Sequence, residues 1–178
     1  MRFSFLISFY LSAAIILIIS FIGLPFKFKT FKFFVNIFTK NMVMILRIFQ
    51  IKIEVVNSQL ANKSGYLFAS KHQSMFETIY YNHLFNNPAY ILKKELLSIP
   101  LFGTYLKKLG MIAIDRSQGI QSLRHVNEQA SNYSKIRPVI IFPEGTRTAF
   151  KEEPDLKPGI YSMYKSLNKP VVPIALNS

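Results

Sequence analysis

The chain has 178 residues, of which 50% are hydrophobic, so it can form one domain with a substantial core and an appended element, whereas two domains would be crowded. The absence of cysteine excludes disulfide scaffolds, thiol catalysis, and zinc or iron–sulfur sites built on cysteine. A formal net charge of +13 indicates an anionic partner, which can be a phospholipid surface, a nucleic acid or a phosphorylated substrate.

The first predicted element is the uncharged run Phe3–Leu24. A helix of this length, rising about 1.5 Å per residue, would just cover a hydrocarbon core of roughly 30 Å, so we predict a membrane segment. The alternatives are a buried core helix and a signal peptide, although the run is long for a signal peptide and no small-residue cleavage site follows it. Only Arg2 precedes the run whereas several lysines follow it, which places the rest of the chain on the cytoplasmic face.

The next predicted element is an amphipathic helix within residues 26–49. Apolar residues recur there at helical spacing, and basic side chains fall elsewhere. A helix that faces the core would show the same stripe, but lysines interleaved with aromatic residues beside a membrane segment also suit an interfacial helix on anionic lipid. We therefore assign residues 1–49 to an N-terminal membrane-attached helical motif. The apolar positions are Phe31, Phe34, Val35, Phe38, Met42, Ile45, Leu46 and Phe49.

Residues 50–178 form the second predicted unit, an α/β domain. Short apolar runs alternate there with polar, helix-compatible stretches, which is typical of a mixed, partly parallel sheet flanked by helices. We expect helices within residues 74–84, 99–109 and 119–134. The predicted strands are Ile51–Val56, Tyr66–Ala69, Ala89–Leu92, Met111–Ile114, Val139–Phe142 and Val171–Leu176.

Polar clusters follow three of these predicted strands, at residues 71–74, 115–117 and 143–147. Ligands of open α/β sheets gather beyond the carboxyl ends of the strands. We therefore expect the three clusters to form one site at one edge of the sheet.

The first cluster lies within the stretch SKHQSMFET, residues 70–78, and contains His72 and Glu77. Histidine can accept a proton near neutral pH, and a carboxylate can fix its tautomer and stabilise the imidazolium. Glu77 also has a purely structural interpretation, because Ser74-x-x-Glu77 matches a capping box at the start of a helix. The two interpretations are compatible if His72 precedes the helix and folds back toward Glu77.

The other two clusters contain arginines. In Phe142–Arg147 the proline and glycine predict a tight turn that ends a strand, where Gly145 can bring backbone amides close to an anion and Arg147 can grip phosphate with two prongs. Arg116 can make another phosphate contact. Each of these segments can also be an ordinary surface turn.

The motifs and their order together resemble the glycerolipid acyltransferase family. The corresponding blocks are KHQSMFE, KKELLSIPLFG followed by IDRS, IFPEGTR, and PVVPIAL, spanning residues 71–176. The resemblance implies an α/β fold with an N-terminal membrane-attached helical motif. It also implies transfer of an acyl chain from acyl-CoA or acyl-acyl carrier protein to lysophosphatidate, with no cofactor and no metal.

The resemblance further implies roles for individual residues. His72 would be the catalytic base and Glu77 its partner. The acceptor's phosphate would be bound by Arg147 and Lys93, and Arg116 would lie near the same phosphate or the acyl carrier. Glu144, Gly145 and Thr146 would complete the substrate-binding turn, which Glu144 and Gly145 shape. Membrane phospholipid is an expected partner. Nucleic acid is not expected, because the net charge is the only feature of the sequence that favours it.

Two features depart from the family pattern. Glu77 stands where the family usually has aspartate, so its longer side chain must retract or the helix start must shift for the carboxylate to hold the imidazole. Family members ordinarily continue beyond the final strand, so we expect the α/β domain to be incomplete at its C-terminus. The alternatives are another acceptor, such as glycerol 3-phosphate or a different lysophospholipid, and an inactive membrane-binding remnant.

Overall fold

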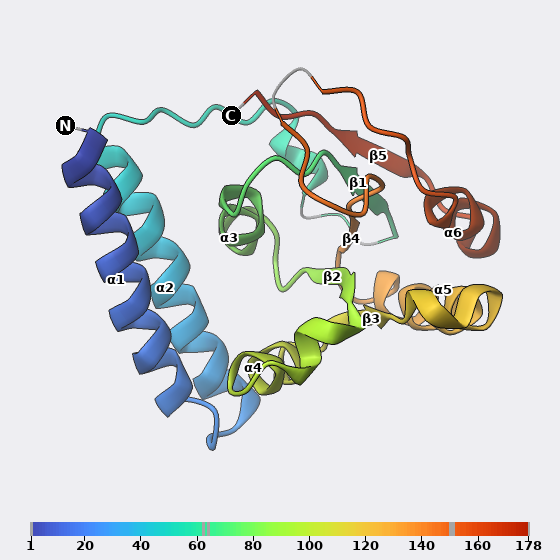
Figure 1. The fold of residues 1–178 in the computed structure, drawn as a ribbon, viewed down its shortest axis with the longest axis horizontal. Coiled ribbons are helices and arrows are strands. Elements are labelled where there is room, and N and C mark those ends of the chain that lie inside the picture. Colours follow the sequence, from blue (N-terminus) through green and yellow to red (C-terminus); the bar gives the residue numbers. More distant parts are fainter. Residues whose placement is uncertain (1, 62, 64, 150–151, 178) are drawn as a thin grey trace.

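The computed structural model describes residues 2–61, 63, 65–149 and 152–177, and Figure 1 shows their arrangement. The helices are α1 (Arg2–Ile22), α2 (Phe28–Ile48), α3 (Phe76–Leu84), α4 (Phe102–Lys108), α5 (Gly119–Ser134) and α6 (Gly159–Leu167). Short 3-10 helices are η1 (Ser58–Leu60), η2 (Lys94–Ser98) and η3 (Arg116–Gln118). The strands are β1 (Leu67–Ser70), β2 (Ala89–Lys93), β3 (Ile112–Ile114), β4 (Val139–Ile141) and β5 (Val171–Ile174).

The strands form one five-stranded sheet in the order β3-β2-β4-β1-β5. Each of its four pairings is parallel, with Ala69 beside Ile141 in the β1–β4 pair and Leu92 beside Ala113 in the β2–β3 pair. The predicted α/β sheet is thus confirmed. Because the strands run the same way, the turns that follow β1, β3 and β4 all leave from the same edge.

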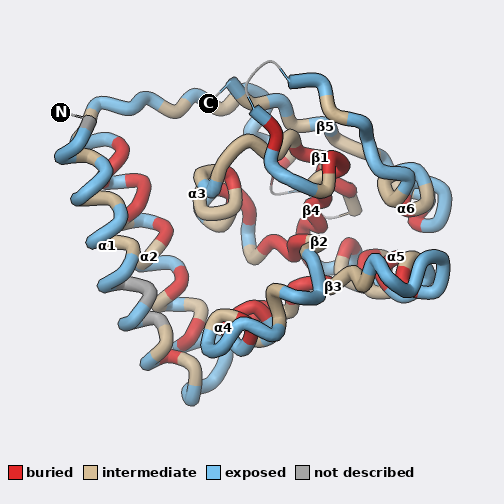
Figure 2. The backbone as a smooth tube through the Cα atoms, in the orientation of Figure 1, coloured by how far each residue is buried: buried red, intermediate tan, exposed pale blue. Residues whose placement is uncertain are grey.

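The sheet separates two hydrophobic clusters, since successive side chains of a strand point to opposite faces. Phe68 and Ile140 pack on one face with residues of α2, α3 and α4. Leu67 and Val139 pack on the other face with residues of α5 and α6. Figure 2 shows the resulting buried centre in red, with helices on both sides of it.

The helical hairpin of α1 and α2 stands beside this α/β core (Figure 1). The hairpin turns at residues 23–27, where Pro25 cannot continue the first helix. The predicted amphipathic helix is confirmed as α2, and its apolar stripe faces the core, with Phe31, Val35 and Met42 buried. The core-facing interpretation is therefore correct for that side of the helix.

The predicted membrane segment forms helix α1, which carries a row of exposed large apolar side chains, including Ile18 at 64% exposure. Among the residues that the structure describes, no helix meets the length and hydropathy of a membrane-crossing span. The predicted crossing is therefore not confirmed.

The predicted strand Ile51–Val56 is wrong. This segment is the connection that leaves α2 and passes to η1, and none of the pairings described in the sheet includes it. Its alternating apolar residues resemble a half-buried strand, but Val56 is 77% exposed. Alternation alone did not predict pairing here because no neighbouring strand lies alongside the segment (Figure 1).

Candidate active site

The site begins where β1 ends at Ser70 and the chain turns into α3. The helix starts at Phe76 and its N-cap is Met75, one residue later than the predicted N-cap Ser74. Ser74 lies in the turn before it, where its Oγ accepts the N–H of Phe76 at 3.0 Å. Glu77 reaches back and accepts the N–H of Ser74 at 2.9 Å. The glutamate half of the predicted capping box is therefore confirmed, and the serine half involves Phe76 instead.

The same glutamate contacts the histidine. Nδ1 of His72 lies 2.8 Å from Oε1 of Glu77, whose side chain is fully buried, while that of His72 is 15% exposed. The predicted contact between His72 and Glu77 is thus compatible with the structural role of Glu77, because the turn before α3 folds His72 back over the helix start. An ionised carboxylate accepts from the Nδ1 proton, which leaves Nε2 as the basic nitrogen.

Glu77 is held in its ionised form. Burial raises the pKa of this carboxyl, but hydrogen bonds from His72, from Ser74 and from the backbone outweigh burial and bring the pKa to about 2. The N–H of Gln73 donates to the same carboxylate at 2.6 Å. Glu77 is therefore negatively charged throughout the neutral range and can stabilise an imidazolium.

His72 is also held by the segment that follows β4, some seventy residues away in the chain. Its backbone N–H donates to Oε2 of Glu144 at 2.9 Å, and its carbonyl accepts the N–H of Thr148 at 2.8 Å. Its ring stacks on Phe142, with centroids 4.3 Å apart and planes tilted by 26°. The imidazole of His72 is therefore held at one face by Phe142 and at Nδ1 by Glu77, and the backbone of His72 is held by Glu144 and Thr148.

The polar cluster after β3, residues 115–117, contacts the turn after β4, residues 143–147, through Arg116. Nη2 of Arg116 donates to the carbonyl of Gly145 at 2.8 Å. Gly145 has a φ of +69°, and a Cβ atom placed on it would lie 2.5 Å from that Nη2, so only glycine fits without displacing the arginine. The predicted meeting of the three polar clusters at one edge of the sheet is confirmed.

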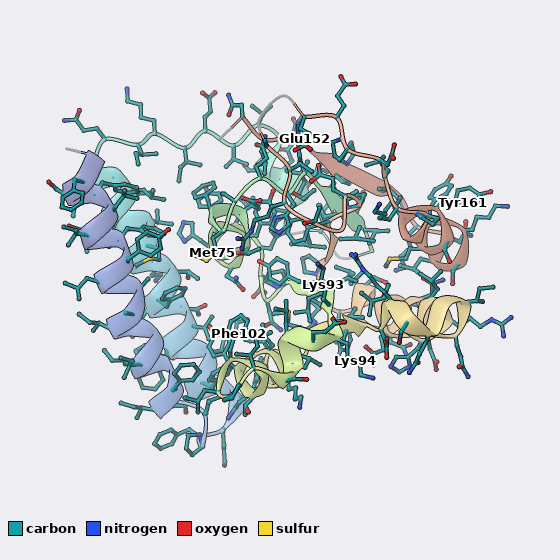
Figure 3. All side chains as sticks on the ribbon, in the orientation of Figure 1. Met75, Lys93, Lys94, Phe102, Glu152 and Tyr161 are labelled. Carbon is teal, nitrogen blue, oxygen red and sulfur yellow. The ribbon has the colours of Figure 1, made fainter. Side chains whose placement is uncertain are left out.

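The predicted phosphate ligands lie around this turn. Thr146 and Arg147 are exposed on it, whereas Glu144 is buried. Lys93 is exposed at the end of β2, and the adjacent Lys94 starts η2 (Figure 3).

Lys94 itself forms an ion pair with the cluster after β3. Its Nζ donates to Asp115 at 2.9 Å, and hydrogen bonds from Ser117 and Lys94 lower the pKa of Asp115 to about 2. The ends of the neighbouring strands β2, β3 and β4 are thus followed by the cationic side chains of Lys94, Arg116 and Arg147, with Lys93 at the last position of β2.

Sequence reasoning missed two residues that contact His72, namely Phe142 and Thr148. Both flank residues 143–147, the PEGTR turn. Their position next to this motif is the sequence signal that could have identified them. Their partner is far away in the sequence, however, and becomes a neighbour only through the parallel pairing of β1 with β4.

Comparison with known proteins agrees with this geometry. Residues 52–177 match the family described as Acyltransferase. A 1-acyl-sn-glycerol-3-phosphate acyltransferase of Pseudomonas aeruginosa is 33% identical over 157 residues, covering 87% of this chain and 61% of that protein. A protein of the same name from Helicobacter pylori is 42% identical over 84 residues, which are 46% of this chain and 35% of the relative. The chain thus spans about three fifths of the length of the first relative and about a third of the second.

The fold has a solved counterpart. The crystal structure of the 1-acyl-sn-glycerophosphate (LPA) acyltransferase PlsC from Thermotoga maritima superimposes with a TM-score of 0.71 at 20% identity, covering 97% of this chain and 75% of that one. The similarity shows that the two chains share a fold that includes both the helical hairpin and the sheet.

Proposed function

Because the chain belongs to the acyltransferase family, we propose that it transfers an acyl chain from an acyl thioester to the sn-2 hydroxyl of lysophosphatidate, giving phosphatidate. The observation that carries this proposal is the His72–Glu77 pair at the sheet edge where the cationic clusters converge. The names of the relatives from Pseudomonas and Helicobacter support lysophosphatidate as the acceptor.

The reaction follows from the orientation of the pair. Nε2 of His72 takes the proton of the acceptor hydroxyl while the hydroxyl oxygen attacks the thioester carbonyl. The tetrahedral intermediate collapses, the C–S bond breaks, and the imidazolium returns its proton to the thiolate of the donor. Glu77 stabilises the imidazolium between these two steps. The donor is an acyl thioester of coenzyme A or of acyl carrier protein, and the acyl group is never attached to the enzyme.

The acceptor's phosphate is bound by the exposed cations around the turn. Arg147 offers a planar fork that matches a phosphate, and Lys93 adds a second charge. A guanidinium carries five N–H donors, so the bond from Arg116 to Gly145 does not exhaust its capacity to bind phosphate. In this arrangement Thr146 and Gly145 contribute the backbone of the turn.

We also propose that residues 1–49 attach the protein to membrane phospholipid, with the acyltransferase domain of residues 50–178 on the cytoplasmic face. The exposed residues of α1 recur every three or four positions and form one apolar stripe, as an interfacial helix requires. Lys27 and Lys29, which follow α1 in the chain, and Lys40 on α2 are exposed and would meet anionic headgroups. The stripe consists of Phe3, Leu6, Ile7, Tyr10, Leu11, Ile15, Ile18, Ile19 and Ile22.

An assay of membranes carrying this chain tests the proposed reaction. Labelled acyl-CoA or acyl-acyl carrier protein is supplied with lysophosphatidate, glycerol 3-phosphate, or a lysophospholipid with a larger headgroup. We expect labelled phosphatidate from lysophosphatidate with the unchanged protein, and no labelled phosphatidate with the His72→Ala variant. Preferential labelling of another acceptor would replace lysophosphatidate in the proposal, and an inactive chain would contradict the reaction.

A further inference from the structure

Thr148 closes a ring of hydrogen bonds around the backbone of His72. Its N–H donates to the carbonyl of His72 at 2.8 Å. Its hydroxyl lies 3.0 Å from Oε2 of Glu144 and 3.3 Å from the same His72 carbonyl. The carboxylate oxygen of Glu144 in turn accepts the N–H of His72 at 2.9 Å. Both polar groups of the His72 backbone are therefore bound from the segment after β4.

We propose that Thr148 is a positioning residue for acyl transfer, which together with Glu144 holds the backbone of His72 so that Nε2 faces the acceptor hydroxyl. This proposal rests on the proposed function, because it takes His72 as the base. It assigns Glu144 to the support of the base and not to the binding of the acceptor's phosphate.

Burial supports this assignment. Glu144 and Thr148 are each only 5% exposed, whereas Thr146 and Arg147 between them are exposed. The turn thus presents its middle residues outward, where a phosphate can reach them, and its two ends inward, where His72 lies. A negatively charged, buried Glu144 would also repel a phosphate, while it suits a backbone N–H donor.

The arrangement links acceptor binding to the orientation of the base. Arg147 directly precedes Thr148, so a displacement of the turn by a bound phosphate is passed to the carbonyl of His72 through one peptide unit. Small errors in the position of a catalytic group can slow a reaction by as much as about 10²-fold. We therefore expect the hydroxyl of Thr148 to affect turnover more than substrate affinity.

The first test compares Thr148→Val with Thr148→Ser. Valine keeps the branched shape and the backbone N–H but removes the hydroxyl, and serine restores it. For Thr148→Val we expect kcat to fall about tenfold, with the KM values for lysophosphatidate and for the acyl donor changed by less than about twofold. Thr148→Ser should remain within about twofold of the unchanged protein in all three constants.

The second test does not require acyl transfer. Diethylpyrocarbonate modifies accessible imidazoles, and peptide mass spectrometry gives a separate rate for each histidine. Loss of the Thr148 hydroxyl should raise the rate at His72 several-fold and leave the rates at the exposed His83 and His125 unchanged. If the unchanged protein forms no phosphatidate, the proposed function fails, but these modification rates still show whether the hydroxyl of Thr148 holds His72 in place.

The positioning role would be overturned by an unchanged kcat together with an unchanged His72 modification rate in Thr148→Val, by an equal loss of kcat in Thr148→Ser, or by a selective rise of the KM for lysophosphatidate in Thr148→Val. A comparison of Glu144→Met with Glu144→Gln tests the same hydrogen bonds from the carboxylate that accepts them. This comparison does not depend on the folding of Thr148→Val. Glutamine keeps an oxygen that can accept from His72 and Thr148, so it should retain most of kcat, and methionine should not. An equal kcat in the two Glu144 variants would contradict the proposal.

Discussion

Oε1 of Glu77 lies 2.8 Å from Nδ1 of His72 and also accepts the N–H groups of Gln73 and Ser74, so one buried carboxylate both shapes the turn before α3 and holds the imidazole. The stretch SKHQSMFET is therefore both a helix start and a hydrogen-bonded histidine–glutamate pair, which we propose to be the base and its partner. This double role means that a substitution at Glu77 changes catalysis and stability through separable physical causes.

Glu77→Gln separates the charge of this residue from its hydrogen bonds. Glutamine keeps an oxygen for the backbone N–H groups but cannot balance an imidazolium, so we expect kcat to fall by roughly 10²-fold. Glu77→Asp should stay active, because it keeps the charge, and His72→Ala should be inactive. The measurement is steady-state acyl transfer by variants whose folding has been checked by circular dichroism. Full activity of Glu77→Gln would mean that the carboxylate serves only the turn.

The pH dependence of stability provides a second test of Glu77. Its pKa is about 2 in the folded protein against an ordinary value of 4.5, so its ionisation stabilises the fold above about pH 4.5 and this contribution is lost as the pH falls toward 2. The lowered pKa corresponds to about 3 kcal/mol at neutral pH. Urea unfolding should therefore show Glu77→Gln less stable than the unchanged protein at pH 7, with the difference vanishing near pH 2.

Asp115→Asn is the matched control for that experiment. The pKa of Asp115 is also lowered to about 2, by hydrogen bonds from Ser117 and Lys94, but this carboxylate lies at the surface, where solvent screens it. Its removal should change the stability curve less than removal of Glu77. Parallel curves for Glu77→Gln and the unchanged protein between pH 2 and 7 would contradict the ionised, buried state of Glu77.

Arg147→Lys tests the proposed grip on phosphate. Lysine keeps the charge but loses the planar fork, so the KM for lysophosphatidate should rise by roughly tenfold while the KM for the acyl donor changes little. Arg124→Lys on the exposed side of α5 is the control and should leave both constants unchanged. Equal changes in both constants for Arg147→Lys would indicate that Arg147 supports the turn and does not bind the acceptor.

Gly145→Ala tests the contact between the turn and Arg116. The new Cβ would meet Nη2 of Arg116 at 2.5 Å in addition to the strain of a φ of +69°. We expect kcat/KM for lysophosphatidate to fall about tenfold, because the strained turn carries Arg147 and displaces Arg116. Gly119→Ala is a close control, since Gly119 has a φ of +51° but no atom within 4 Å of an added Cβ. It should lose stability without losing activity.

The apolar stripe of α1 is tested by single charges. Leu11→Asp or Ile18→Asp should reduce flotation with vesicles of phosphatidylcholine and phosphatidylglycerol, because an aspartate on that stripe would enter the acyl-chain boundary. Ile120→Asp, which changes an equally exposed isoleucine on α5, should float as the unchanged protein does. Attachment through the stripe should persist in high salt, whereas attachment through lysines alone should not. Undiminished flotation of both α1 variants would place the attachment elsewhere.

The sequence by itself determined the features that depend on near neighbours. Strand ends followed by polar clusters, the helical stripe of α2 and the five-residue spacing of His72 and Glu77 all reflect short-range geometry, which periodicity and turn chemistry report directly. The same local signals gave wrong answers where a tertiary neighbour was needed. Ile51–Val56 reads as a strand, but none of the strands that the structure describes pairs with it. The start of α3 differs by one residue for a local reason, because Oγ of Ser74 accepts the N–H of Phe76 within the preceding turn.

Only the tertiary structure decided which residues of the PEGTR turn face the base and which face solvent. Parallel pairing of β1 with β4 brings the carbonyl of His72 to the N–H of Thr148, and it places Phe142 against the imidazole ring. Parallel pairing joins strands through long crossovers, so the contacts it creates have no spacing that a sequence pattern can show. The hydrogen bonds from Thr148 and Glu144 to the backbone of His72 therefore depend on the strand order, whereas the contact between His72 and Glu77 depends on the local chain.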